Sequence, residues 1–488
     1  MFMEKREPTF IESILALSFM VIFVFGGFFL FNLDVALMLV ASAACAGLLA
    51  KRLGYTWNDL EKAIGERLMR ATPAILIIWT IGIVIATFIF SGSIPMLIFY
   101  GMQIIQPEYI FVTSFVICII FSTLIGSSWG SGGTAGVALI SIAAGLGAPL
   151  DITAAAIICG AIFGDKMSPL SETTNLASLT SGVNIYEHIK SMMWTTLPAT
   201  IISFIVFFIA GKSVNFSTQN VATNDLGLVN DLGSIYSWNL LLLVPFVIIL
   251  LGAILKQPPV PVMLTACLVA LIIGVTYQGF SLQDGVSAAS DGFEVSMISG
   301  VNPDQLSSDT LSLLNRGGFV SMLGVIIIIY CGYAYTSVIS EAGFFKRALH
   351  PLTNRVRKRG PLVVMTLLSQ SLLFMFSGTS YIGFLMVPEM FKKSFLKVGM
   401  AAKTLSRSLE DAGTVIGPLV PWSSAGVFFS STLGVSIYGS SGYAIWSVLC
   451  YVTPVIAIIL AYTGIGVYKM SKEEKEEALN QYELNKTS

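Results

Sequence analysis

The residues best suited to chemistry lie in the stretch GDKMSPLSETTNLA (residues 164–177), which follows an apolar run. Asp165, Ser168 and Glu172 are spaced i, i+3 and i+7, so a continuous helix would present them on one face. Pro169 removes a backbone donor, and the helix is predicted to unwind near Asp165–Ser168, which frees carbonyl groups. Carboxylate, hydroxyl and carbonyl oxygens are the ligands that a small hard cation prefers. The stretch is therefore predicted to line a cation pocket; a helix end with ordinary solvated charges is the alternative.

Asp165 is the predicted carrier of both ions, because a proton and a cation each neutralise a carboxylate that is withdrawn from water. Lys166 points about 100° away from it on a helix, so the two need not pair. Lys166 either neutralises another buried acid when the cation leaves or forms a plain structural salt bridge. Ser168 and Glu172 are predicted to add ion-binding oxygens. The residues predicted to line the substrate path are Glu172, Thr173, Thr174 and Asn175.

A second polar cluster begins at Glu410 and Asp411 and continues to Thr414 within the run EDAGTVIGPLVPW. Two adjacent carboxylates that are partly withdrawn from water do not both ionise easily and titrate as a coupled pair. Asp411 is predicted to bind an ion or a proton, whereas Glu410 and Thr414 are predicted to line the path. Lys403 and Arg407 lie just before the cluster, so the alternative places Glu410 at the water interface.

Small polar residues interrupt two further apolar segments, at residues 109–147 and 361–391. The interruptions read IGSSWGSGG and FSGTSYIG, and such a break suits two half-helices that meet at a tip, as in a re-entrant hairpin. Hydroxyls at the tips would face the ion; alternatively, small residues there let helices pack closely. The residues concerned are Ser127, Ser128, Ser377, Thr379 and Ser380.

These segments need a membrane to position them. The chain of 488 residues is 55% hydrophobic and 11% charged, whereas soluble domains are about 25% charged. Apolar windows of about 18 residues recur along it, and each is long enough to cross a bilayer core. The chain is predicted to be an all-α, multi-pass protein of the cell membrane with ten crossings and two re-entrant hairpins.

Positive charge is distributed unevenly under this topology. With the N-terminus inside, 24 of the 27 Lys and Arg residues fall on the cytoplasmic side, as the positive-inside rule requires. Lys212 and Arg316 are the external exceptions, and Lys166 lies within the membrane. The segments expected outside are 211–237 and 278–317, and those expected inside are both termini, residues 346–359 and residues 392–407.

The same order of elements occurs twice: three crossings, a broken hairpin, an interrupted crossing and a final crossing. Five crossings is an odd number, so the second unit must enter the membrane in the opposite orientation, which predicts an inverted repeat. The predicted divisions are a first repeat with its N-terminal cytoplasmic segment (1–210), an external linker (211–237), a second repeat (238–468) and a cytoplasmic tail (469–488).

Several function classes find no support in the sequence. No nucleotide-binding glycine loop or nucleophile elbow occurs, and the six cysteines show no metal or disulfide spacing. With only two histidines, a transition-metal site is not expected. The chain is predicted to be no enzyme, to need no cofactor and to bind no nucleic acid.

The run GDKMSPLSETTNLA, with the preceding GSSWGSGGTAGVAL, resembles the NhaC family of sodium/proton antiporters, a branch of the ion-transporter superfamily. The likeness in length and order covers nearly the whole chain. It implies inverted five-helix repeats, each with a re-entrant hairpin and an interrupted helix, and often a homodimer. It also implies Na⁺ sites at the hairpin tips. The positions are Asp165 and Ser128 with Ser127 in the first unit and, on the looser match SGTSY, Ser377, Thr379, Ser380 and Asp411 in the second.

Two functions therefore compete. The first is a secondary active antiporter that exchanges Na⁺ for H⁺ across the cytoplasmic membrane by competition at a buried carboxylate. The alternative is a Na⁺-coupled transporter or exchanger of a small organic acid of the malate or lactate type, or of an amino acid, since the same family includes such proteins. Positive charge facing the cavity would favour the organic acid; only Lys166 qualifies, and this favours the cation alone.

Overall fold

The computed structural model describes residues 5–31, 33–214, 218–255, 257–353 and 358–487. Helices make up nearly all of the regular structure in these ranges, as a bilayer demands, because lipid offers backbone groups no partners. The prediction of an all-α membrane protein is confirmed.

The described part of residues 1–210 folds almost entirely into helices. They are α1 (Phe10–Met20) with a π-helical continuation η1 (Val21–Leu30), α2 (Val35–Arg52), α3 (Trp57–Phe90), α4 (Ser93–Ile104), α5 (Ile110–Ile125), α6 (Ser128–Ser131), η3 (Gly132–Gly136), α7 (Val137–Gly145), α8 (Leu150–Met167), α9 (Glu172–Ser181) and α10 (Ile185–Ser213).

The remaining helices begin with α11 (Thr218–Ile235), which occupies most of the predicted linker. The others are α12 (Val244–Ile254), α13 (Pro259–Thr276), α14 (Leu282–Asp291), α15 (Ser308–Leu314), α16 (Leu323–Glu341), α17 (Phe344–Thr353), α18 (Arg359–Ser377), α19 (Ser380–Lys397), α20 (Ala402–Ala412), η8 (Gly417–Leu419), α21 (Ser424–Leu433), α22 (Val448–Thr463) and α23 (Lys472–Thr487).

Seven described helices are long and apolar enough to cross a membrane, and two sharply bent pairs raise the number to nine, against ten predicted crossings. The first and last predicted crossings correspond to shorter apolar helices, Phe10–Val24 and Val448–Thr463. Both α5 and α18, the first arms of the predicted hairpins, are themselves long enough to span. The hairpin prediction therefore holds for the position of each break, while the first arm of each is longer than a half-helix.

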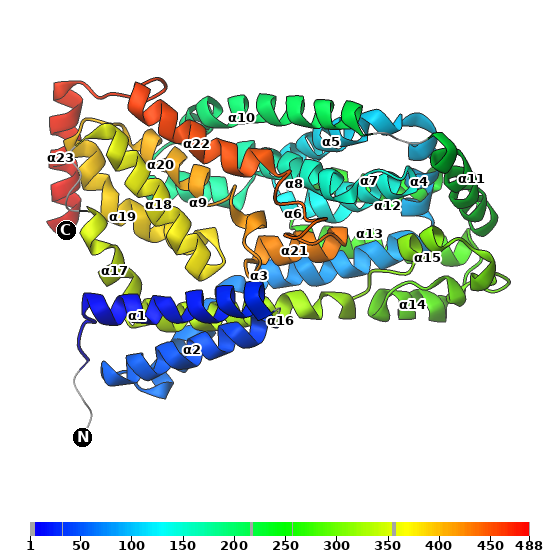
Figure 1. Cartoon of the computed structure of the whole chain (residues 1–488), viewed down its shortest axis with the longest axis horizontal. Coiled ribbons are helices and arrows are strands. Elements are labelled where there is room, and N and C mark those ends of the chain that lie inside the picture. Colours follow the sequence, from blue (N-terminus) through cyan, green and yellow to red (C-terminus); the bar gives the residue numbers. More distant parts are fainter. Residues whose placement is uncertain (1–4, 32, 215–217, 256, 354–357, 488) are drawn as a thin grey trace.

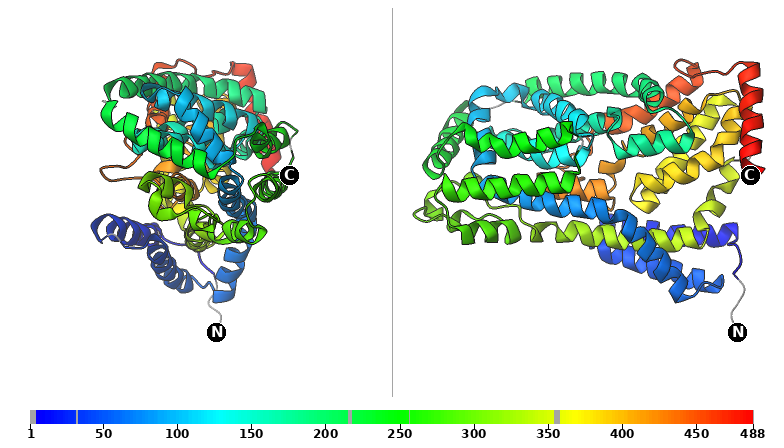
Figure 2. Two further views of the ribbon diagram at one scale, coloured as in Figure 1. Left: turned by 90° about the vertical axis from the view of Figure 1, so that its right-hand side faces the viewer. Right: turned by 180° about the vertical axis from the view of Figure 1, so that it is seen from behind.

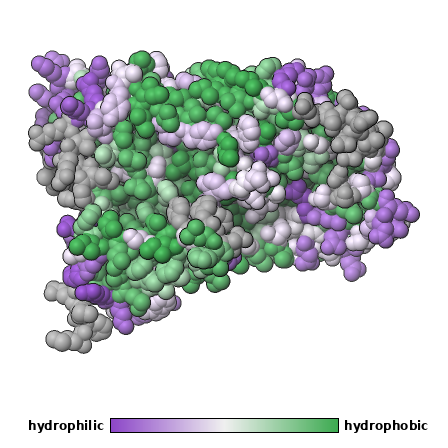
Figure 3. Space-filling model, in the orientation of Figure 1, coloured by the Kyte–Doolittle hydropathy of each residue, from purple (hydrophilic) through white to green (hydrophobic). Residues whose placement is uncertain are grey.

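The helices run mostly along the long axis of an elongated molecule (Figure 1). The start of α1 and the whole of α23 lie at one end, and α11 and α15 lie at the other, as the reverse view also shows (Figure 2). Hydrophobic residues cover much of the middle of the visible face, and hydrophilic residues gather toward both ends (Figure 3). This distribution is the one expected where lipid surrounds the middle of the molecule.

The two predicted repeats pack against each other reciprocally. Helix α2 of the first lies against α16 of the second, and α13 of the second lies against α3 of the first. Helices α3 and α16 touch each other, as do α10 and α22, and each pair occupies the same place in the two units. A two-fold relation between the units would produce this reciprocity, so the packing supports the inverted-repeat prediction.

Helix α8 approaches α5 so closely that two of its positions accept only glycine. A Cβ atom at Gly160 would lie 2.3 Å from the carbonyl oxygen of Phe115, and one at Gly164 would lie 2.5 Å from the amide nitrogen of Thr123. Real side chains cannot make such contacts without shifting a helix backbone. The C-terminal end of α8 is therefore fixed beside the tip at which α5 ends.

Candidate ion site at the helix breaks

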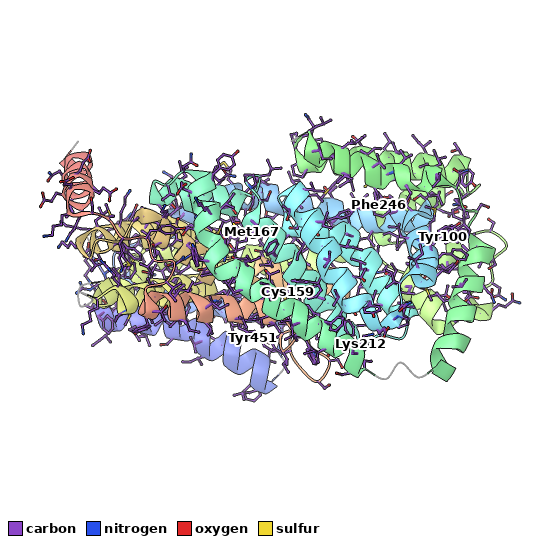
Figure 4. All side chains as sticks on the ribbon, turned by 90° about the horizontal axis from the view of Figure 1, so that it is seen from above. Tyr100, Cys159, Met167, Lys212, Phe246 and Tyr451 are labelled. Carbon is purple, nitrogen blue, oxygen red and sulfur yellow. The ribbon has the colours of Figure 1, made fainter. Side chains whose placement is uncertain are left out.

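The break between α8 and α9 lies at the end of the range in which it was predicted. Helix α8, on which Cys159 and Met167 are labelled in Figure 4, continues through Met167. Asp165 and Lys166 are therefore helical, and the unwinding predicted near Asp165–Ser168 occurs at the last residue of that range. Proline disfavours helical geometry in the residue before it, and Ser168, at ψ 131°, is the first residue to leave the helix.

Two residues predicted to line the substrate path instead satisfy the carbonyl groups that the break leaves free. The Thr174 hydroxyl donates to the Lys166 carbonyl at 3.0 Å, and the Asn175 amide donates to the carbonyls of Pro169 at 2.9 Å and Ser171 at 2.7 Å. Carbonyl groups at a helix end have no partner within the helix, and side chains such as these satisfy them. Thr174 and Asn175 therefore stabilise the backbone at the break.

Each carboxylate oxygen of Asp165 accepts a hydrogen bond from one serine hydroxyl. Ser128 donates to Oδ2 at 2.7 Å, and Ser171 donates to Oδ1 at 2.6 Å. The side chain of Asp165 is buried, at 8% exposure. The sequence prediction that Ser128 and Asp165 lie together agrees with this geometry.

The first hairpin tip has the backbone conformation that brings Ser128 to Asp165. Gly126 ends α5 with φ +72°, and a Cβ atom there would lie 2.5 Å from that of Leu170 in the break. Ser127 then begins α6, because its hydroxyl accepts from the Gly130 amide at 3.2 Å. Glycine is needed at this tip both for the positive φ and for the close approach.

Ser171 is the site residue that sequence reasoning missed, and Ser168 was chosen in its place. Ser168 donates to the Thr123 carbonyl at 2.9 Å and therefore ties the break to α5. Ser171 precedes the first residue of α9, but its side chain does not cap the backbone of that helix, although its hydroxyl lies 3.0 Å from the Thr173 hydroxyl. It donates to Asp165 instead. A serine at a helix start after a proline was the available signal, but on a straight helix Ser171 would not face Asp165.

Lys166 forms an ion pair with Asp411, and both side chains are fully buried. The Thr195 hydroxyl of α10 donates to the same carboxylate at 2.9 Å, and the Arg407 Nε atom lies 3.9 Å from its other oxygen. This pair fits both alternatives for Lys166, the neutralisation of another buried acid and a structural salt bridge, so both stay predictions. This pair joins α8 to α20, the first helices of the two interrupted crossings.

Glu410 is fully buried, which contradicts the alternative that placed it at the water interface. The Thr414 hydroxyl donates to its Oε2 at 2.5 Å, and its Oε1 has no hydrogen-bond partner in the part of the chain that the structure describes. Arg407, counted on the cytoplasmic side in the sequence analysis, is also buried, because it donates to the Gly466 carbonyl at 2.9 Å and lies beside Asp411.

The second hairpin repeats the backbone of the first but not its carboxylate contact. Gly378 ends α18 with φ +68°, and Thr379 begins α19 by accepting from the Tyr381 amide at 3.2 Å. The Ser377 hydroxyl donates to the Thr379 carbonyl at 2.8 Å. Among the described residues, no hydrogen bond joins these tip residues or Ser380 to Asp411, whose carboxylate is occupied by Lys166. The second ion site therefore stays a prediction.

A cavity of about 330 Å³ lies between the two hairpin tips. Its charged lining consists of Asp165 and Glu172 in the described part of the chain, and the Tyr381 hydroxyl donates to Glu172 across it at 2.8 Å. Lys166, Glu410 and Asp411 lie behind its wall. The predicted residues that line it are Ser127, Ser128, Asp165, Glu172, Thr173, Thr379, Ser380 and Thr414.

Known proteins are similar to this sequence over nearly its full length. The family model described as "Na+/H+ antiporter family" matches residues 160–465. An "Uncharacterized Na(+)/H(+) antiporter" of Haemophilus influenzae is 39% identical, covering 96% of this chain and 98% of its own. NhaC of Alkalihalophilus pseudofirmus is 34% identical (95% and 98%), and a "Malate-2H(+)/Na(+)-lactate antiporter" of Bacillus subtilis is 32% identical (98% and 99%). The chain therefore belongs to the NhaC family of Na⁺/H⁺ antiporters.

Proposed function

We propose that the protein exchanges Na⁺ for H⁺ across the cytoplasmic membrane by competition at a site of buried carboxyl groups, in which Na⁺ binds at Asp165. The observation that carries this proposal is a buried carboxylate at a helix break, on the wall of a cavity, with a hydroxyl on each oxygen. A hydroxyl donates to a carboxylate, accepts from a carboxylic acid and turns a lone pair toward a cation. Ser128 and Ser171 therefore suit the empty, protonated and Na⁺-bound states alike.

The charge of the cavity favours a cation over an organic acid. An organic carboxylate would meet Asp165 and Glu172 and, among the described lining residues, no basic side chain. The volume of about 330 Å³ is nevertheless larger than Na⁺ alone requires, and one relative is named for malate and lactate. Na⁺-coupled exchange of a small organic acid is the second candidate; in it, Na⁺ at Asp165 would supply the missing positive charge.

The same proposal includes the membrane arrangement. Residues 1–210 and 238–468 form inverted repeats joined by an external linker, and both termini are cytoplasmic. Reciprocal packing of α2 on α16 and of α13 on α3 supports the repeat. The distribution of Lys and Arg, and the position of α1 and α23 at one end of the molecule, support the orientation.

Proteoliposomes with an imposed pH gradient separate the two candidate functions. Na⁺ added without any organic solute is expected to move protons across the membrane. Proton movement that appears only after malate, lactate or an amino acid is added would contradict simple Na⁺/H⁺ exchange and support the second candidate.

Removing either of the two serine hydroxyls that donate to Asp165 is expected to weaken Na⁺ binding. A hydrogen bond to a charged group contributes about 1.5–3 kcal/mol. Ser128→Ala and Ser171→Ala should therefore each raise the apparent dissociation constant for Na⁺ by roughly 10- to 100-fold. Ser168→Ala is the matched control, because its hydroxyl binds the Thr123 carbonyl and not Asp165. Na⁺-dependent transport rates in proteoliposomes measure all three. Equal weakening in the control would mean that the serines act through the shape of the break.

A further inference from the structure

The buried charges of the described chain form a single cluster behind the cavity. Five charged side chains are buried in this part of the chain: Asp165, Lys166, Arg407, Glu410 and Asp411. Lys166 and Arg407 both face Asp411, and Glu410 is within electrostatic reach of Lys166, Asp165 and Asp411. The cluster therefore behaves as one electrostatic unit, in which a charge added at one position affects all the others.

The cluster contains three carboxyl groups against two basic groups. With all three carboxyls ionised it carries one excess negative charge, and either one proton or one Na⁺ removes that excess. A proton together with a Na⁺ would leave an uncompensated positive charge out of contact with water, which is costly. Entry of one Na⁺ should therefore expel one proton from the cluster.

The surroundings of the carboxyls indicate which of them holds that proton. Asp411 is ion-paired with Lys166, and Asp165 has a hydroxyl on each oxygen and faces the cavity. Glu410 has one hydroxyl partner, Thr414, and its Oε1 has none among the described residues. Burying an ionised carboxylate with an unpaired oxygen costs more than burying the neutral acid.

We propose that the proton displaced when Na⁺ binds Asp165 is held by Glu410. Na⁺ adds its charge at Asp165, the Glu410 carboxyl loses its proton, and the net charge of the cluster does not change. Thr414 provides the route, because its hydroxyl touches Glu410 and its side chain lines the cavity. When Glu410 is protonated, the Thr414 hydroxyl turns to accept from the acid. It then passes its own proton to cavity water as it takes the proton of Glu410. This inference rests on the proposed function and divides its two ions between two carboxyls.

The other elements packed against α20 leave this assignment unchanged. Helix α10 contributes His188, whose Nδ1 lies 2.8 Å from the Ser406 hydroxyl, and α9 and α19 contribute the Glu172–Tyr381 pair at the cavity. The one charged residue at the start of α18, Arg359, donates to the Val398 carbonyl. Helices α21 and α22 contain no charged residue.

Calorimetric Na⁺ titration of purified Glu410→Gln at neutral pH, in buffers of different ionisation enthalpy, tests the proposal. The wild-type protein is expected to release close to one proton per Na⁺. The variant is expected to bind Na⁺ more weakly, because no carboxyl can offset the added charge, and to release close to no protons when Na⁺ saturates it. Glu187→Gln, which removes an exposed carboxylate paired with Lys403, is the control and should release protons as the wild type does. Release near one proton in Glu410→Gln would place the proton on Asp165 and overturn the inference, while leaving the proposed Na⁺/H⁺ exchange intact.

Infrared difference spectroscopy decides the same question if Glu410→Gln does not fold. Na⁺ should remove one protonated-carboxyl band from the wild-type spectrum. Thr414→Val is expected to shift that band, because the threonine hydroxyl binds Glu410. Ser128→Ala is expected to leave the band in place, because its hydroxyl binds Asp165. A shift in the serine variant and none in the threonine variant would overturn the inference.

Discussion

Replacement of Asp165 by asparagine is expected to reduce Na⁺-dependent proton movement to the background of empty liposomes. The amide keeps the shape of the carboxylate and can still hydrogen-bond with Ser128 and Ser171, so the protein should fold and insert. It carries no negative charge, however, and therefore has no charge for Na⁺ to neutralise. Transport in proteoliposomes, with thermal unfolding in detergent as the folding check, measures the effect.

Asp151→Asn is the matched control for this variant. Asp151 lies in the first turn of the same helix, α8, and does not line the cavity. Its substitution is expected to leave exchange unchanged. If Asp165→Asn exchanged Na⁺ for H⁺ at the normal rate, Asp165 would be structural, and Glu410 and Asp411 would become the candidates for the ion site.

Asp411→Asn is expected to have the largest effect on stability. The substitution leaves the Lys166 ammonium fully buried without its carboxylate. Breaking a buried ion pair from one side typically costs about 3–5 kcal/mol, because the remaining charge is uncompensated. The free energy of unfolding in detergent should fall by this amount, whereas Asp165→Asn should change it much less, because Asp165 is paired with hydroxyls and not with a cation.

A second substitution checks the reason for this loss. Lys166→Met combined with Asp411→Asn removes the unpaired charge and should recover most of the stability, since replacing both partners of a buried pair costs far less than removing one. A loss below about 1 kcal/mol in Asp411→Asn alone, the size typical of an exposed pair, would mean that the Lys166–Asp411 contact is not a buried ion pair.

Local backbone chemistry explains why the sequence could predict the helix breaks. Gly126 and Gly378 adopt positive φ at the two hairpin tips, and each is followed by a hydroxyl residue that begins the next helix. Pro169 ends α8 by its effect on the residue before it. Glycine, proline and N-terminal serine act within a few residues, so their consequences are visible in the sequence alone.

The parts of the site that sequence reasoning missed depend on contacts between distant segments. Ser171 reaches Asp165 only because the chain changes direction after Ser168, and helical spacing assumed a straight path. Lys166 and Asp411 are 245 residues apart in the chain, and no periodicity relates them. The family resemblance implied ion residues in both units, but it could not show that Asp411 of the second unit is paired with Lys166 of the first.

The central claim is that Na⁺ and H⁺ compete within one buried carboxylate cluster centred on the Asp165 site. Calorimetric Na⁺ titration of the wild-type protein, in detergent at several pH values, tests this claim most directly. No membrane gradient is present in this measurement, so any proton release comes from the binding site itself. The account predicts that Na⁺ affinity falls as the solution becomes more acidic and that proton release per Na⁺ approaches one at low pH. Na⁺ binding of constant affinity, with no proton release across the mildly acidic to mildly alkaline range, would contradict it.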